Sequence, residues 1–459
     1  MLNLIDVFFV CIVVYLVLRW NFGSHWDFGD KIPGYNGMPI VGFWYQYFSV
    51  KFEDAYANFL EIAKPFDSVF KIWWGLNLIL FIRKPEDIKI LLNADESYDK
   101  PKKMYKTFFN RGLFVSSGEK NRLYRKTMSI ILDSKAMQTY IPTINIKMKN
   151  FLKSFDEKLK ENGDEMDISK HTLDFALIAI LSSMFGCEDF NEDERLKFLQ
   201  DVEELKKHES SISDFVEIIE TGVEKNINKV ESTDKKFYPP LEQIYEITKL
   251  INHFELKDEI STIVISGSQK TGKVIAATIL MLAMNPNKQE KVIDELVTIF
   301  NGKSDQIMDE RTLNRMKYLE MVVKETIRLL PPIPQISRQI RKDIELADLQ
   351  IPAGVIVSFF PQIIHTDKKY WGDDADEFIP ERFSDTNFSK IHPYAYIPFS
   401  NGERSCIGDR YAWNVIKTFL SQFLMRYRVT TKLKFAELKL YSLFTLNIKQ
   451  GFMVNIEKR

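Results

Sequence analysis

The sequence predicts a mainly α-helical protein with small β-sheets. Apolar residues recur at helical spacing over long stretches, which is typical of helices that bury one face. The clearest row begins after residue 406, where an apolar residue recurs at every fourth position: Ile407, Tyr411, Val415, Phe419 and Phe423. Strand-like runs are short, and two of them, residues 69–73 and 78–81, are joined by Gly75-Leu76-Asn77. Such a turn between two runs predicts a small sheet beside the helical body.

Length and composition are those of an ordinary globular protein. The chain has 459 residues, of which 45% are hydrophobic and 27% are charged, so it can bury a large core. With 62 Lys and Arg against 63 Asp and Glu, the net charge does not point to nucleic acid. The three cysteines, Cys11, Cys187 and Cys406, are too few for a disulfide framework and favour a reducing setting.

The first 18 residues are mostly Leu, Ile, Val and Phe. A bilayer is usually spanned by about 20 such residues. Leu18-Arg19-Trp20 follows without the small residues of a cleavage site, so residues 1–20 are predicted to be an uncleaved membrane anchor. Asp6 near its start and Arg19 after it favour a cytosolic position for the rest of the chain.

Behind the anchor, residues 21–40 contain Pro33 and Pro39 and are predicted to be a stiff linker. No further linker, repeat or low-complexity tract divides the remainder, so residues 41–459 are predicted to form one domain.

Two long apolar helices are predicted in the middle of the chain. The first follows Ser169 and ends near Gly186, and a charged stretch then continues to about Lys257. The second spans residues 263–283.

Cys406 lies in a turn-rich segment, residues 398–408, at the start of the apolar row. It therefore stands at a helix N-terminus, where the macrodipole and free N–H groups favour a thiolate. Gly402 and Gly408 flank it and let the backbone approach a flat ligand closely. An isolated thiolate held in this way suits a haem iron, because thiolate ligation favours cleavage of the O–O bond. We therefore predict that Cys406 is an axial ligand of haem iron.

The pattern Phe399-x-x-Gly402-x-Arg404-x-Cys406-x-Gly408 resembles the haem-thiolate loop of the cytochromes P450 at all its fixed positions. The resemblance covers residues 30–455 and is strongest after residue 310. The sequence from Arg404 to Trp413 is most similar to arthropod microsomal members of the family-four clan. The resemblance implies the P450 fold, a haem-thiolate domain over residues 41–459, and haem b that is noncovalent apart from the Cys406 axial bond.

The resemblance also assigns cations to the haem propionates. Arg125, Arg338 and Arg404 stand at the family's propionate-binding positions. Members usually carry Trp where Asn121 stands, so one expected propionate partner is missing or weakened here.

A second implied feature is an ionic network that holds the proximal wall of the haem site. On the helix before Pro331-Pro332, Glu325 and Arg328 are three residues apart and share a face. The resemblance assigns both, with Arg382 of the 378–383 segment, to a buried carboxylate–guanidinium network.

The sequence departs from the family on the distal side of the haem. Members place a small residue, Gly, any residue, an acid and Thr in the long apolar helix, opposite the haem, to deliver protons to dioxygen. Pro286 lies sixteen residues after Lys270, the spacing that members show between their threonine and a proline. Gln269 therefore replaces the acid, Lys270 replaces the threonine, and Thr271 follows. We expect these three as the distal catalytic residues.

The resemblance implies a monooxygenase that inserts one oxygen atom from O2 into a lipophilic small molecule. NADPH–cytochrome P450 reductase would supply electrons, with cytochrome b5 as a candidate second donor, at the cytosolic face of the endoplasmic reticulum membrane. Basic residues that could dock a donor are Lys120, Arg122, Lys126 and Arg410. Pocket-lining candidates are Phe108, Phe114, Ile333 and Phe444.

Two other functions stay open, because Gln269 and Lys270 replace the acid–threonine pair. A haem-thiolate isomerase or dehydratase needs neither O2 nor a proton relay. A non-catalytic haem protein needs no distal chemistry at all. Neither the substrate nor the oligomeric state can be read from the sequence.

Overall fold

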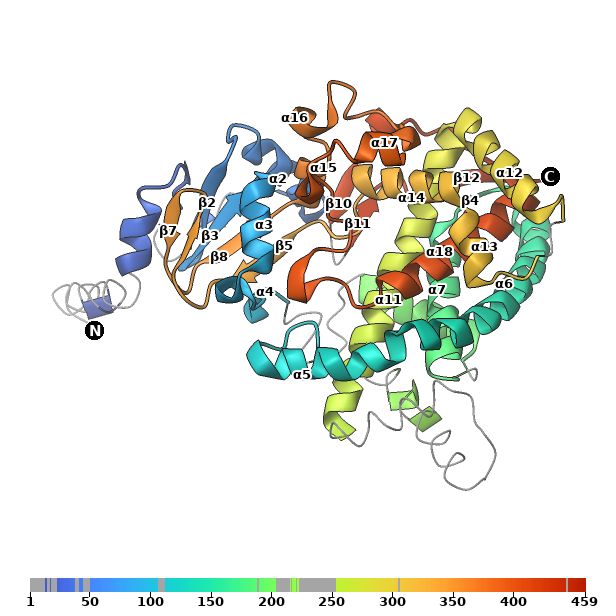
Figure 1. Ribbon diagram of the computed structural model, residues 1–459, viewed down its shortest axis with the longest axis horizontal. Coiled ribbons are helices and arrows are strands. Elements are labelled where there is room, and N and C mark those ends of the chain that lie inside the picture. The colour runs from blue at the N-terminus through green and yellow to red at the C-terminus, as the bar shows by residue number, and fades with distance from the viewer. Residues whose placement is uncertain are drawn as a thin grey trace, which may run out of the picture. The chain divides into compact units, whose positions relative to one another are not determined.

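The computed structural model describes most of the chain (Figure 1): residues 13–14, 17, 23–37, 41–43, 50–105, 112–187, 190–203, 215, 217–219, 221–222, 253–303, 306–442 and 445–459. The chain divides into two compact units. The smaller unit comprises residues 1–101, 335–360 and 401–404, and the larger unit comprises residues 102–334, 361–400 and 405–459. As predicted, the described residues are mainly helical, with several small sheets.

The smaller unit is built on a five-stranded sheet of order β1-β2-β3-β8-β5. Its strands are β1 (Gly34–Tyr35), β2 (Val69–Trp74), β3 (Asn77–Ile82), β5 (Ile336–Gln339) and β8 (Ile356–Phe359). A separate hairpin joins β6 (Ile344–Leu346) to β7 (Leu349–Ile351). The helical elements of this unit are η2 (Phe52–Asp54), α2 (Ala55–Ala63), α3 (Pro85–Asn93), η3 (Asp95–Ser97) and η7 (Gly402–Arg404).

The predicted hairpin at 69–81 is confirmed as antiparallel β2 and β3. Gly75 has φ +60°, a conformation that favours glycine, and so closes the turn. Phe70 pairs with Phe81 across the strands, and their rings stack with centroids 5.1 Å apart. Such cross-strand aromatic pairs stabilise a sheet. The sheet anchors Arg338 of β5, which is buried.

The larger unit contains the remaining described elements. Its helices are α4 (Lys102–Tyr105), α5 (Gly118–Met128), α6 (Ser134–Asn162), α7 (Ser169–Met184), α8 (Glu192–Glu203), α11 (His253–Met284), α12 (Pro286–Phe300), α13 (Glu310–Arg315), α14 (Lys317–Leu329), α15 (Pro361–His365), α16 (Lys368–Trp371), α17 (Asp385–Phe388) and α18 (Asp409–Arg426). Its 3-10 turns are η4 (Ser129–Leu132), η5 (Pro380–Phe383), η6 (Pro393–Ala395) and η8 (Phe435–Glu437). Its strands are β4 (Glu165–Asp167), β9 (Tyr427–Thr430) and β12 (Met453–Lys458), in the order β4-β12-β9, and the hairpin β10 (Leu440–Ser442) with β11 (Leu446–Ile448).

Helices α11 and α7 lie side by side and are the two apolar helices that the sequence predicts (Figure 1). Glycines permit their close approach. A Cβ on Gly272 would come within 2.7 Å of the Leu173 Cα, and one on Gly267 within 2.6 Å of an Ile180 methyl. The Thr172 hydroxyl adds a hydrogen bond of 2.9 Å to the Gly272 carbonyl. This contact sets how α11 is rotated about its own axis.

An aromatic core joins α6, α7 and α18. Phe419 of α18 contacts Phe151 and Phe175, with ring centroids 5.0 Å from each. The apolar row predicted after residue 406 is therefore buried from Tyr411 to Phe423, although α18 begins only at Asp409.

The predicted anchor, residues 1–20, lies outside the described residues except for positions 13, 14 and 17. Within the part of the chain that the structure describes, no helix is both long and apolar enough to cross a bilayer. In the predicted linker, residues 23–29 are helical and β1 follows.

Candidate functional site

Cys406 lies directly before α18, as the sequence predicts. Its backbone N–H donates to the Phe399 carbonyl at 2.8 Å, which closes the loop onto itself. Earlier in the loop, Gly402 has φ +73°, and a Cβ there would stand 2.0 Å from the Leu92 carbonyl oxygen. Only glycine fits that position. Gly402, one of the two glycines that flank Cys406, is therefore required by the backbone conformation of the loop.

The Cys406 side chain is exposed, and it is the group of the loop on which nearby charges act. Burial raises the pKa of the thiol and outweighs the opposing effects of the Gly408 N–H and of the Lys270 and Arg125 charges. The Gly408 N–H at the helix N-terminus thus favours the thiolate, as the sequence predicts, and burial opposes it. A metal cation would also favour the thiolate, because it binds the deprotonated form.

Arg125 on α5 reaches the same loop. Its guanidinium donates to the Ser405 hydroxyl at 3.2 Å, and its charge lowers the pKa of Cys406. Asn121, one turn earlier, is buried, and its amide donates to the Leu113 carbonyl at 2.7 Å and to the Ser116 hydroxyl at 2.9 Å. The amide that stands in place of tryptophan therefore ties the preceding loop to α5.

The smaller unit carries the other two predicted propionate partners. Arg338 on β5 is 1% exposed and Arg404 in η7 is 7% exposed. Arg338 donates to the Ser337 carbonyl at 3.1 Å, and the Arg404 guanidinium lies 5.1 Å from the centroid of the Tyr98 ring. Guanidinium groups suit anionic ligands, because they donate charge-assisted hydrogen bonds in a planar fork.

The three predicted distal residues point in different directions from α11. Thr271 is buried and lies four residues after Gly267, so it shares the helix face that packs on α7. Gln269 is also buried, and its amide donates to the Leu199 carbonyl of α8 at 3.5 Å. The structure therefore turns these two side chains toward neighbouring helices.

Lys270 leaves α11 on a third side, because successive residues of a helix point in different directions. Its ammonium is 5.6 Å from the centroid of the Phe114 ring. Burial lowers its pKa to about 8, and the charge of Cys406 opposes that shift. Of the predicted distal residues, Lys270 is the one that the structure couples electrostatically to the predicted iron ligand.

Two of the predicted pocket-lining residues are described. Phe114 and Ile333 are both half-buried, and Phe114 meets Tyr105 edge to face at 5.2 Å. Phe108 and Phe444 lie outside the described residues.

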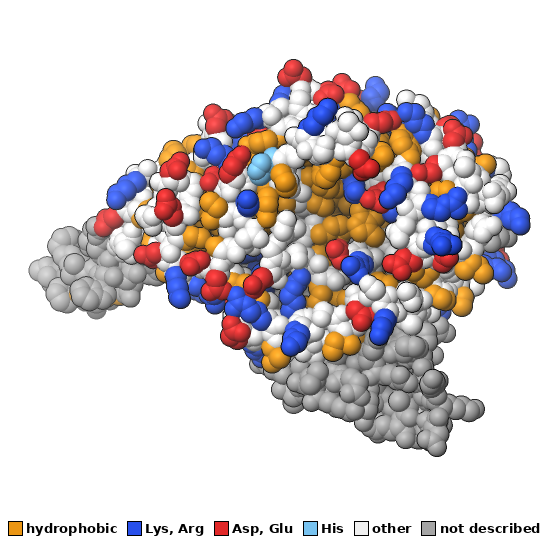
Figure 2. Space-filling model, viewed as in Figure 1, with side chains coloured by type: hydrophobic (Ala, Val, Ile, Leu, Met, Phe, Trp, Pro, Cys, Tyr) orange, Lys and Arg blue, Asp and Glu red, His pale blue; other side chains and the backbone are white. Residues whose placement is uncertain are grey.

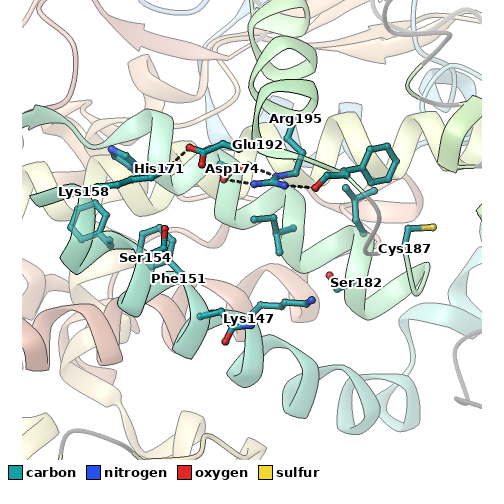
Figure 3. Close-up of a pocket in the computed structure, with 15 residues that line it drawn as sticks. Lys147, Phe151, Ser154, Lys158, His171, Asp174, Ser182, Cys187, Glu192 and Arg195 are labelled. Carbon is teal, nitrogen blue, oxygen red and sulfur yellow. Dashed lines mark hydrogen bonds and ion pairs between the residues drawn. The ribbon is translucent and has the colours of Figure 1, made fainter. Parts of the chain in front are cut away.

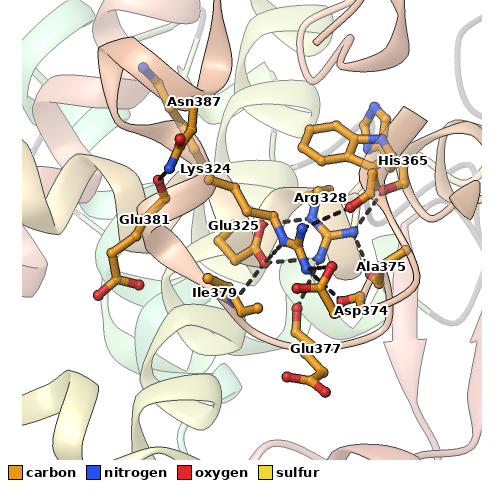
Figure 4. A network of polar contacts seen from close by, with 12 residues as sticks. Lys324, Glu325, Arg328, His365, Asp374, Ala375, Glu377, Ile379, Glu381 and Asn387 are labelled. Atoms are coloured by element: carbon orange, nitrogen blue, oxygen red, sulfur yellow. Dashed lines mark hydrogen bonds and ion pairs between the residues drawn. The ribbon is translucent and has the colours of Figure 1, made fainter. Parts of the chain in front are cut away.

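The predicted buried ionic network is confirmed (Figure 4). The side chains of Glu325 and Arg328 are 0% exposed, and they form two hydrogen bonds of 2.7 and 2.9 Å. Arg382 lies 3.6 Å from the same carboxylate. A bidentate guanidinium–carboxylate pair of this kind is geometrically specific.

Arg328 also binds backbone carbonyls of the segment that leads toward the Cys406 loop. Its remaining N–H groups donate to the carbonyls of His365, Ala375 and Glu377 at 2.6–3.0 Å. The His365 ring accepts from the Ile397 N–H at 3.0 Å, and burial together with the Arg328 charge lowers its pKa to about 3. The sequence did not indicate His365. No local pattern marks a neutral histidine that accepts a hydrogen bond from a backbone N–H far away in the sequence.

The predicted docking residues lie on α5 and at the start of α18, and none of their side chains is buried. Arg122 pairs with Glu119 at 2.6 Å, and Arg410 donates to the Ser134 hydroxyl at 2.5 Å. Figure 2 shows Lys and Arg side chains interspersed with acidic ones over this face of the molecule. The predicted docking residues on α5 and α18 therefore do not belong to a uniformly basic face.

A cavity of about 270 Å³ lies elsewhere in the larger unit, between α6, α7 and α8 (Figure 3). Four of its charged lining residues form two pairs: Arg195 donates to Asp174 at 2.6 and 3.1 Å, and Lys158 pairs with Glu192. None of the predicted haem-binding or distal residues lines it.

Similarity to known proteins agrees with the geometry. A family model described as "Cytochrome P450" matches residues 32–237 and 242–454. "Probable cytochrome P450 313a4" of Drosophila melanogaster is 27% identical, over 97% of each chain. "Cytochrome P450 4V2" of Homo sapiens is 26% identical, over 85% of this chain and 82% of its own. "Cytochrome P450 4g15" of Drosophila melanogaster is 23% identical, over 97% and 95%.

Arg328→Lys should destabilise the protein by about 3–5 kcal/mol, because lysine keeps the charge but cannot supply the fork that binds Glu325 and the carbonyls. Urea unfolding of the holoprotein measures the loss. Lys64→Gln is the matched control: Lys64 pairs with Glu61 at the surface at 2.6 Å, and removing an exposed pair should change stability by less than about 1 kcal/mol. Equal effects of the two substitutions would contradict a structural role for the network.

Proposed function

The chain belongs to the cytochrome P450 family, whose members are haem-thiolate monooxygenases, and we propose that it oxygenates a lipophilic small molecule. The observation that carries the proposal is Cys406. It combines the family's loop sequence with an exposed thiol and with cationic groups that act on that thiol. The family match over most of the chain extends the argument beyond one loop.

The residues present fit a haem. Cys406 would hold the iron, and Arg125, Arg338 and Arg404 would hold the propionates. Once bound, the haem would supply the activation of O2. Ser266 stands where many family-four relatives carry a glutamate that esterifies haem, and serine has no carboxylate to do so. The cofactor should therefore be noncovalent apart from the axial bond, and acid–organic extraction should release all of it.

The substrate is proposed to be lipophilic because Phe114 and Ile333 stand at pocket-lining positions of the family and are only half-buried. Apolar linings with few polar groups bind apolar ligands. Nothing in these two side chains selects one lipophilic compound over another.

Electrons are proposed to come from NADPH through cytochrome P450 reductase, with cytochrome b5 as a candidate second donor. Lys120, Lys126 and Arg410 are exposed and could attract an acidic flavoprotein surface. The site of action is proposed to be the cytosolic face of the endoplasmic reticulum, held there by residues 1–20.

The arrangement of α11 gives a specific reason to keep a second candidate, a haem-thiolate isomerase or dehydratase. Proton delivery to the distal site normally uses an acid and an alcohol. Here Gln269 cannot ionise and bonds to α8, and Thr271 faces α7. A reaction that rearranges an already oxygenated substrate would need no such relay.

Cys406→Ala should abolish the red-shifted Soret band of the reduced, CO-bound protein, because that band reports thiolate ligation. Absorption spectroscopy of the purified variant measures it. Cys187→Ala is the matched control, since Cys187 is a buried cysteine whose thiol lies 3.8 Å from the Ile219 carbonyl. A band that survives the loss of Cys406 would refute the haem-thiolate assignment.

Turnover should depend on NADPH and O2 but be poorly coupled, with most electrons lost to peroxide or superoxide. The double substitution Gln269→Asp with Lys270→Thr should raise the ratio of product to NADPH consumed, because it supplies an acid–alcohol pair. Product formation without NADPH would favour the isomerase. Efficient coupling in the native protein, worsened by the double substitution, would mean that these residues relay protons in a different way.

Deletion of residues 1–20 should lower the fraction of protein that sediments with microsomes without changing the haem-to-protein ratio, because the predicted anchor lies outside the haem domain. Carbonate-washed membranes and CO difference spectra measure the two quantities. A secreted form cleaved after the apolar run would contradict the anchor.

A further inference from the structure

We propose that the Lys270 amine is the sixth ligand of the haem iron in the resting protein, so that the chain closes its own distal site until another ligand displaces the lysine. The inference rests on the proposed function, because it requires haem on Cys406. It adds a residue that binds the iron from the distal side.

The rotation of α11 directs Lys270 to this position. Gly267 and Gly272 fix one face of the helix against α7, since a side chain at either would clash. Gln269 is held toward α8 by its bond to Leu199. Lys270 leaves the helix on a different side, and its charge and that of Cys406 act on each other. In the family, this stretch of helix lies across the haem from the cysteine.

The chemistry of the side chain suits the assignment. Lysine reaches much further than the threonine that it replaces, and its stem can cross an apolar surrounding. On binding, the ammonium releases a proton to solvent, its nitrogen lone pair forms the bond to iron, and any water on the iron leaves. No electron is transferred.

In the structure the Lys270 ammonium lies over an aromatic ring. It stands 5.6 Å from the Phe114 ring, and cation–π contacts of this kind contribute about 0.5–2 kcal/mol. One further polar group is nearby on the helix. Ser266 lies one turn before Lys270 on the same face, and its hydroxyl is buried without a hydrogen-bond partner. The proposal thus gives Lys270 a second position, at the iron, in addition to the one over Phe114.

Lys273 provides a matched control on the same helix. It is 4% exposed, and its ammonium lies 5.2 Å from the centroid of the Phe452 ring. It is therefore also a buried lysine over a phenylalanine, three residues further along α11, and it borders a different group of side chains. Any general effect of removing a buried lysine should appear in both variants.

The test uses the purified ferric holoprotein, followed by absorption and electron paramagnetic resonance spectra and by titration with imidazole. The wild type should be low-spin with the signature of a nitrogen ligand trans to thiolate. Lys270→Met should lose that signature and bind imidazole about tenfold more tightly, because about nine-tenths of the wild-type sites would be closed by the lysine. Lys273→Met should match the wild type in both respects.

Chemical rescue makes the assignment specific. In Lys270→Ala, added methylamine should restore the wild-type ferric spectrum, since it supplies the missing amine. The inference is overturned if the wild type and Lys270→Met share one ferric spectrum and one imidazole affinity. The reduced CO-bound spectrum separates this failure from failure of the proposed function: a thiolate band in both proteins leaves Cys406 as ligand and rejects only Lys270.

Discussion

The close contact between α11 and α7 governs the geometry on which the distal side of this protein depends. Gly267 and Gly272 allow two buried helices to approach so nearly that a single added methyl group would clash with Ile180 or Leu173. Because α11 cannot rotate against that contact, every side chain along it has a fixed direction. The same constraint that stabilises the helix pair thus decides which residues are buried against neighbouring helices and which residue leaves the helix on another side.

A second constraint operates through charge rather than packing. Arg328 and Glu325 are fully buried, and the guanidinium also collects carbonyl groups from three positions between residues 365 and 377. A buried ion pair contributes little net stability relative to apolar residues, yet breaking one is costly. The pair instead specifies one path of the chain, because only that path supplies acceptors for all five N–H donors of the guanidinium. That path leads on through Ile397, held by His365, toward the Cys406 loop.

Two residues that depart from the family pattern lie close to each other in the structure. Asn121 stands where the family usually carries tryptophan, and here it fastens the loop that carries Phe114. Phe114 in turn lies beneath the ammonium of Lys270. Two unusual residues, far apart in the sequence, therefore belong to one local arrangement on the larger unit. The thiol of Cys406 adds to it, since its protonation is opposed by the charge of that same lysine.

The sequence by itself determined the mainly helical class, the hairpin at residues 69–81, the cysteine at the start of α18 and the pairing of Glu325 with Arg328, because each depends on local periodicity or on a motif of adjacent residues. Only the tertiary structure decided that Gln269 bonds to α8, that Thr271 faces α7 and that the charge of Lys270 acts on Cys406. It also added an effect that the sequence did not predict, since burial raises the pKa of Cys406 while the Gly408 N–H lowers it. The physical reason is the same in each case. Helix rotation and desolvation depend on neighbours that are distant in the chain, so a run of adjacent residues does not determine either of them.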